Sequence, residues 1–135
     1  YTLPSNVLAT DGDMLRITMG FRCAANATTK RLRVYFGSSV VTDSTAIAQN
    51  NQIINVTVYV ARTGATSQYV QTAAIETANG SAWSTAVTGG VAFPTAPTEN
   101  VENTILIRTT ITLGAGAALN DVIQDYMIVE YLRKP

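Results

Sequence analysis

The chain has 135 residues, of which 47% are hydrophobic and only 13% are charged, against about 25% charged in an average protein. Its nine basic and nine acidic residues balance and form no block of Lys and Arg, which argues against a nucleic acid as partner. The length is typical of one domain, so we expect a single domain over residues 1–135. No stretch approaches the ~18 consecutive apolar residues that a membrane-spanning helix needs, so we expect no membrane insertion.

Two strands are predicted near the beginning of the chain, because apolar side chains recur there at every second position. The first starts at Met14, and the second runs to Phe36 after a polar turn at residues 26–29. Cys23 is the only cysteine, which excludes an intrachain disulfide, and its apolar surroundings predict a buried thiol. The side chains predicted to point inward are Leu15, Ile17, Met19, Phe21, Cys23, Leu32, Val34 and Phe36.

The middle of the chain predicts a hairpin followed by a long connection. A short apolar piece, Val40–Val41, precedes a polar stretch and then a strand with Ile54, Val56, Val58 and Val60 on one face. Gly64 provides the freedom for a tight reversal, so residues 69–77 are expected to pair back. Residues 78–100 interrupt the pattern with Gly and Pro. This segment predicts a loop containing one short strand at residues 91–93.

Two further strands complete the pattern. Residues 105–113 alternate until Gly114 ends the run. Residues 122–132 form the last strand, in which Met127, Val129 and Tyr131 alternate with Tyr126, Ile128 and Glu130. About seven or eight strands without a convincing amphipathic helix predict an all-β, antiparallel two-sheet sandwich. A jelly-roll-like arrangement is favoured, because the 78–100 connection suits a crossing between sheets.

The residue types present exclude most catalytic mechanisms. The chain has no histidine, which removes the commonest general base and the commonest transition-metal ligand. No phosphate-binding glycine loop is present either. We therefore predict no enzymatic activity and no cofactor or metal.

Carboxylate pairs are the remaining catalytic possibility, because a glycosidase needs only two at a suitable distance. The candidates are Asp11, Asp13, Asp121 and Asp125. For the first two, an ordinary Asp-Gly turn is favoured over a calcium site. For the last two, solvated or salt-bridged surface positions are favoured over catalysis.

Binding residues are sought among the aromatic side chains and the loops. Aromatic side chains can form a platform that stacks on sugar rings, with core or subunit-interface packing as the favoured alternative. The aromatic residues considered are Tyr35, Tyr59, Tyr69, Trp83, Phe93, Tyr126 and Tyr131, of which Tyr69, Trp83 and Phe93 are taken as binding candidates. Loops 78–100 and 114–120 are candidate contact regions because binding residues concentrate on loops. Asn120, at the turn before the last strand, completes the candidate set.

Several short segments resemble, in their order and spacing, a bacteriophage virion domain. These segments are Asp11–Ile17, Asn26–Lys30, Leu32–Gly37, Val60–Gln68, Asn120–Gln124 and Val129–Tyr131. The domain they resemble lies at the ends of tail-fibre and tail-spike proteins and in head fibres and capsid-decorating proteins. The resemblance implies a jelly-roll-like homotrimer on the exterior of the phage particle.

Two functions follow from this resemblance as expectations. In the first, the module belongs to a tail fibre, spike or head fibre and mediates attachment to a bacterial surface glycan or protein. In the alternative, it is a capsid decoration protein that stabilises the head. Both functions require other virion proteins as partners.

Overall fold

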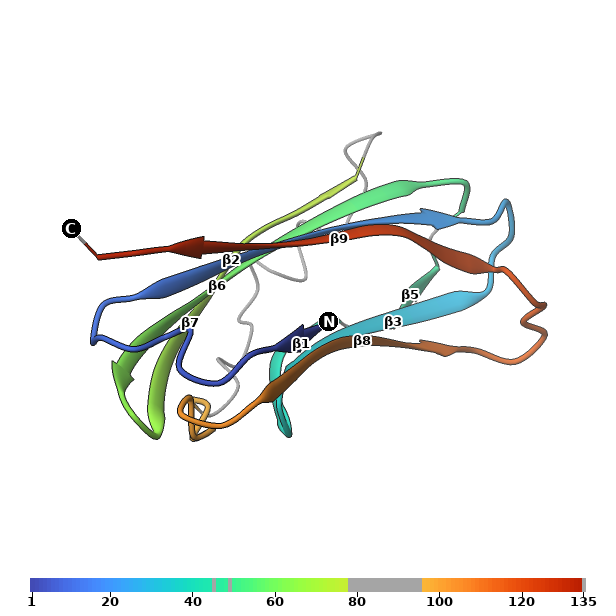
Figure 1. The fold of residues 1–135 in the computed structure, drawn as a ribbon. Helices are drawn as coiled ribbons and strands as arrows, with labels where there is room; N and C mark the ends of the chain where they lie inside the picture. Colours follow the sequence, from blue (N-terminus) through green and yellow to red (C-terminus); the bar gives the residue numbers. More distant parts are fainter. Residues whose placement is uncertain (45, 49, 78–95, 135) are drawn as a thin grey trace.

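The computed structural model describes residues 1–44, 46–48, 50–77 and 96–134. Within these residues the chain forms nine strands in two antiparallel sheets (Figure 1). This confirms the predicted all-β, two-sheet sandwich. None of the described segments is a helix long and apolar enough to cross a membrane. The short strand predicted at residues 91–93 lies outside the described residues.

The first sheet has the order β1-β8-β3-β4, and β5 also pairs with β3. The strands β1 and β5 have only two residues each, too few for alternation to reveal them in the sequence. The bounds in this sheet are β1 Thr2–Leu3, β3 Thr29–Phe36, β4 Ser39–Asp43, β5 Ile47–Ala48 and β8 Ile105–Leu113.

The second sheet has the order β7-β6-β2-β9. Its strands are the longest of the fold: β2 Met14–Cys23, β6 Ile53–Gly64, β7 Ser67–Thr77 and β9 Val122–Leu132. Three connections, β3–β4, β4–β5 and β6–β7, stay within one sheet, and the other connections pass from one sheet to the other (Figure 1). The connection from β7 to β8 is therefore a crossing, as the sequence predicted for residues 78–100.

The core lies between the sheets and consists of the inward side chains of both. Every inward residue predicted for β2, β3 and β6 is buried, including Cys23, which is 6% exposed. Hydroxyl contacts join the sheets at two places: Thr42 on β4 meets Thr72 on β7 at 2.8 Å, and Thr109 on β8 donates to Gln124 on β9 at 2.6 Å. The described residues thus share one core.

The strand β9 is an edge strand, and its burial differs from that of β2 and β6. Met127 and Val129 are half-buried against the core, while Tyr131, expected on the same side, is 42% exposed. A bulge interrupts the pairing with β2 between Gly20 and Phe21. Gly20 pairs with Tyr126 and Phe21 with Gln124, which leaves Asp125 as the extra residue. The bulge therefore changes which side chains of β9 share a face.

Candidate functional site

The predicted binding residues do not form one site. Trp83 and Phe93 lie outside the described residues. Tyr69 lies on β7 and is 55% exposed, whereas Asn120 lies in the turn between β8 and β9. These two positions are at opposite ends of the β7-β6-β2-β9 sheet (Figure 1). The ends of β2, Met14 and Cys23, lie beside these two positions, and a strand of 10 residues spans roughly 30 Å.

Tyr69 borders a shallow apolar depression of about 310 Å³ on the outside of this sheet. Its residues are neighbours across three strands, since Ala61 pairs with Met14 on one side and with Tyr69 on the other. The small Ala61 side chain leaves space between larger neighbours. We call this the tyrosine depression, and its lining residues are Met14, Tyr59, Ala61, Tyr69 and Gln71.

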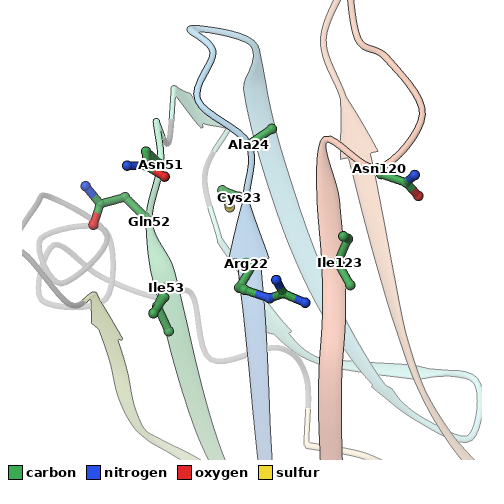
Figure 2. A pocket seen from close by; sticks show the side chains of 8 residues that line it. All are labelled: Arg22, Cys23, Ala24, Asn51, Gln52, Ile53, Asn120 and Ile123. Atoms are coloured by element: carbon green, nitrogen blue, oxygen red, sulfur yellow. The ribbon is translucent and has the colours of Figure 1, made fainter.

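Asn120 borders a second hollow, of about 470 Å³, at the other end of the sheet. Figure 2 shows the Arg22 side chain extending toward Ile123, and the Gln52 amide turned away from Cys23. The Oε1 atom of Gln52 is buried and has no hydrogen-bond partner. We call this hollow the amide pocket, and its lining residues are Arg22, Cys23, Ala24, Asn51, Gln52, Ile53, Asn120 and Ile123.

The amide pocket contains no activated nucleophile among the described residues. Burial raises the pKa of the Cys23 thiol, despite the nearby Lys30 charge that lowers it, so the reactive thiolate is disfavoured. The Arg22 guanidinium is engaged by Asp125, with contacts of 2.7 to 2.9 Å. What remains is a set of carboxamide groups, which can bind polar ligands but do not activate water or a substrate.

The carboxylates considered for catalysis are all engaged in structural contacts. Asp11 pairs with Arg62 at 2.9 Å, and Asp125 pairs with Arg22. Asp13 is buried and accepts from the backbone N–H of Thr10, and this hydrogen bond is the main reason why its pKa is lowered. These contacts agree with the predicted turn and with the predicted salt-bridged surface position of Asp125. Within the described part of the chain, no group of three or more His, Cys, Asp or Glu residues could hold a metal ion.

Asp121 contradicts the prediction of a solvated or salt-bridged position. It is only 3% exposed, and its carboxylate accepts from Asn26 Nδ2 at 2.8 Å and from the Ala118 N–H at 3.0 Å. Asn26 in turn accepts from the fully buried Lys30 ammonium at 2.9 Å. This chain of hydrogen bonds joins the β2–β3 loop to the β8–β9 loop. It was missed because the sequence pattern does not reveal which loops lie side by side.

The outward surface of the β7-β6-β2-β9 sheet has no unpaired charge on its described side chains. Arg16 meets Glu130 with contacts of 2.6 and 2.8 Å, and Arg22 is held by Asp125. These partners lower the pKa of both carboxyls. We call this surface the neutral face, and its large apolar side chains, between 38% and 55% exposed, are Ile53, Tyr69, Ile123, Tyr126, Ile128 and Leu132.

The outward surface of the other sheet is different, because its strands carry an excess of positive charge. Arg31 and Arg33 share the single carboxylate of Asp43, at 2.7 and 3.0 Å. Arg108 lies over the Tyr35 ring, 4.6 Å from its centre. We call this the arginine face. Two arginine faces would repel each other, whereas two neutral faces would not.

Comparison with protein-family models, with curated proteins and with solved structures finds no match to this chain.

Proposed function

We propose that this chain is a non-enzymatic structural module on the exterior of a bacteriophage particle, where it works as a homotrimer in attachment to the host surface. The observation that supports this most is the neutral face, which exposes six large apolar side chains while its charges are paired within the chain. An exposed apolar surface of this kind is typical of association sites. Because its charges need no outside partner, sister copies can cover it.

Two further features favour this proposal over an enzyme. The carboxylates that a glycosidase would need are engaged by arginine, backbone or amide groups. The order of the short segments from Asp11 to Tyr131 also resembles that of phage fibre and decoration domains. The homotrimer, the virion location and the bacterial surface partner come from this resemblance.

The proposal is tested with the purified chain and the phage that carries it. Light scattering is expected to give the mass of three chains, and the chain should bind host cells saturably and slow adsorption of the phage. Replacing residues 78–95 with an unrelated flexible segment keeps the contacts of Glu99 with Ser38 and Ser39, and it should abolish cell binding and leave the mass of three chains unchanged. Host cells that bind the replaced chain equally well would contradict the role in attachment.

Capsid decoration is the alternative, and the neutral face favours it too because a flat apolar surface can bind another virion protein through buried area. In this case the chain would bind undecorated capsids at a fixed ratio and raise the temperature at which they open. Cell binding without capsid binding would support attachment, and the reverse result would support decoration.

A further inference from the structure

We propose that the homotrimer is built by a head-to-tail contact, in which Leu119 of one copy inserts into the tyrosine depression of the next. This rests on the proposed function, since it names the contact through which the copies associate. Both halves of the contact are present on one chain: the exposed side chain of Leu119 and the uncharged tyrosine depression.

The inserted half is the most exposed large hydrophobic side chain described. Leu119 is 92% exposed, at the tip of the loop between β8 and β9. The loop residues on either side of it, 115–118 and 120, are exposed as well. A single exposed leucine is normal on a protein surface, and burial of this one in a partner would remove its apolar area from water, which is favourable.

The loop holds Leu119 in one place. The Asp121 N–H donates to the Ala118 carbonyl at 3.2 Å and closes a tight turn around Leu119 and Asn120. Asn120 has a φ of 68°, the left-handed conformation that Asn tolerates in such a turn. The buried Asp121 carboxylate accepts from the Ala118 N–H and from Asn26. A turn whose backbone is already ordered loses less entropy on binding.

The receiving half matches this side chain in chemistry and size. The tyrosine depression is lined by Met14, Ala61 and two tyrosine rings, and its volume is about 310 Å³. Apolar cavities of roughly 150 Å³ hold a molecule the size of benzene, so a leucine side chain fits with room for its neighbours. None of the lining residues is charged, which favours an aliphatic group over an ionic ligand.

The contact must be between molecules, because the two halves are at opposite ends of the sheet (Figure 1). Different surfaces then meet at each contact, and repetition of such a contact closes into a ring when the rotation allows it. The neutral face, four strands wide and about ten residues long, offers roughly 600 Å² at the usual strand spacing. With the loop added, this approaches the ~800 Å² per partner of a stable interface.

The test uses one variant for each half of the contact in the full chain. Leu119→Asp places a charge on the inserted side chain, and Ala61→Lys fills the depression. Each variant is expected to weaken association roughly thirtyfold or more, as for a central interface residue. Light scattering over a dilution series measures the mass, and circular dichroism checks that each variant keeps its β structure. Leu106→Asp is the matched control, because Leu106 is 49% exposed on the other sheet and should leave association unchanged.

Mixing the two variants gives a result that general destabilisation cannot mimic. The intact depression of the Leu119→Asp chain can accept Leu119 from the Ala61→Lys chain, so the mixture should form pairs of two chains that do not grow further. If the mixture forms no pairs, or if Leu119→Asp alone keeps the wild-type mass, the head-to-tail contact is wrong while self-association stands. A wild-type chain that is monomeric at every concentration would overturn both proposals.

Discussion

The Glu99 carboxylate illustrates how one side chain fixes a turn far away in sequence. Its Oε1 atom accepts from the backbone N–H and hydroxyl groups of both Ser38 and Ser39, at 2.6 to 3.1 Å. Partial burial raises the pKa of Glu99, but these donors, Ser38 first, outweigh burial and hold it below the ordinary value of 4.5. The ionised form therefore stabilises the β3–β4 turn.

This hydrogen-bonded carboxylate predicts a pH dependence of stability. Because the folded pKa is depressed, the contribution of Glu99 is complete above the ordinary value of 4.5 and is lost as the pH falls through the lower folded value. Glu99→Gln should reduce the free energy of unfolding at neutral pH, and the gap to the wild type should close on acidification. Urea unfolding between neutral and strongly acidic pH measures this gap.

The control for this prediction is Glu102→Gln, because Glu102 is exposed in the same connection. Its removal should change the pH profile much less. A gap between wild type and Glu99→Gln that stays constant across the acid range would show that the ionised carboxylate does not support the turn.

Among the elements, β2 and β9 depend on a glycine for their close pairing. Gly20 is buried beneath the ring of Tyr126, which reaches across β2 and donates its hydroxyl to Asn55 on β6 at 2.9 Å. A Cβ atom on residue 20 would lie too close to the Cε1 atom of that ring for a van der Waals contact. Glycine in a strand interior often marks such a close approach or a bulge. Gly20 lies beneath Tyr126 and also next to the bulge in the β2–β9 pairing.

Gly20→Ala is therefore expected to displace Tyr126 and break its hydrogen bond to Asn55. Overpacking of this kind typically costs about 1–3 kcal/mol, which denaturant unfolding at equilibrium would detect. Gly64→Ala is the matched control, because an added Cβ there would lie 3.5 Å from Ser67 Cβ, an ordinary contact. If the two substitutions changed the free energy of unfolding equally, this result would contradict the close approach of Tyr126 to Gly20 in solution.

The same elements show what the sequence could and could not predict. Alternation identified the inward residues of β2 and β6 because both strands are interior to their sheet and continuous. Strict alternation along β9 would place Ile123 and Tyr126 on opposite faces of the sheet. The bulge at Asp125 brings both onto the neutral face. A bulge is set by pairing with the neighbouring strand, which one sequence does not specify.

The candidate site was predictable only in part for a related reason. Tyr69 and Asn120 were singled out, but the tyrosine depression also needs Met14 and Ala61, which lie on different strands. Their outward direction follows from alternation, whereas their proximity follows from the register of three strands. The buried Asp121 likewise depends on the packing of two loops.

At the scale of the whole molecule, the two outer surfaces differ in the partners they allow. The arginine face carries Arg31, Arg33 and Arg108 against the single carboxylate of Asp43, so it favours water or an acidic partner. The neutral face, whose charges are paired within the chain, favours an apolar partner surface. This difference orients each copy in the proposed trimer, with the arginine face turned outward and available to other molecules.

Arg16 pairs with Glu130, and Arg22 pairs with Asp125, inside one chain. These pairings predict how the association of the copies depends on salt concentration. Salt at 1 M shortens the reach of charge interactions to about 3 Å, but the residues that line the tyrosine depression are uncharged, so the proposed contact contains no ion pair that salt would screen. Sulfate would even strengthen apolar burial. Sedimentation should therefore measure the same assembly mass at low and at high sodium chloride concentration. Dissociation of the assembly by sodium chloride would instead indicate ion pairs between subunits.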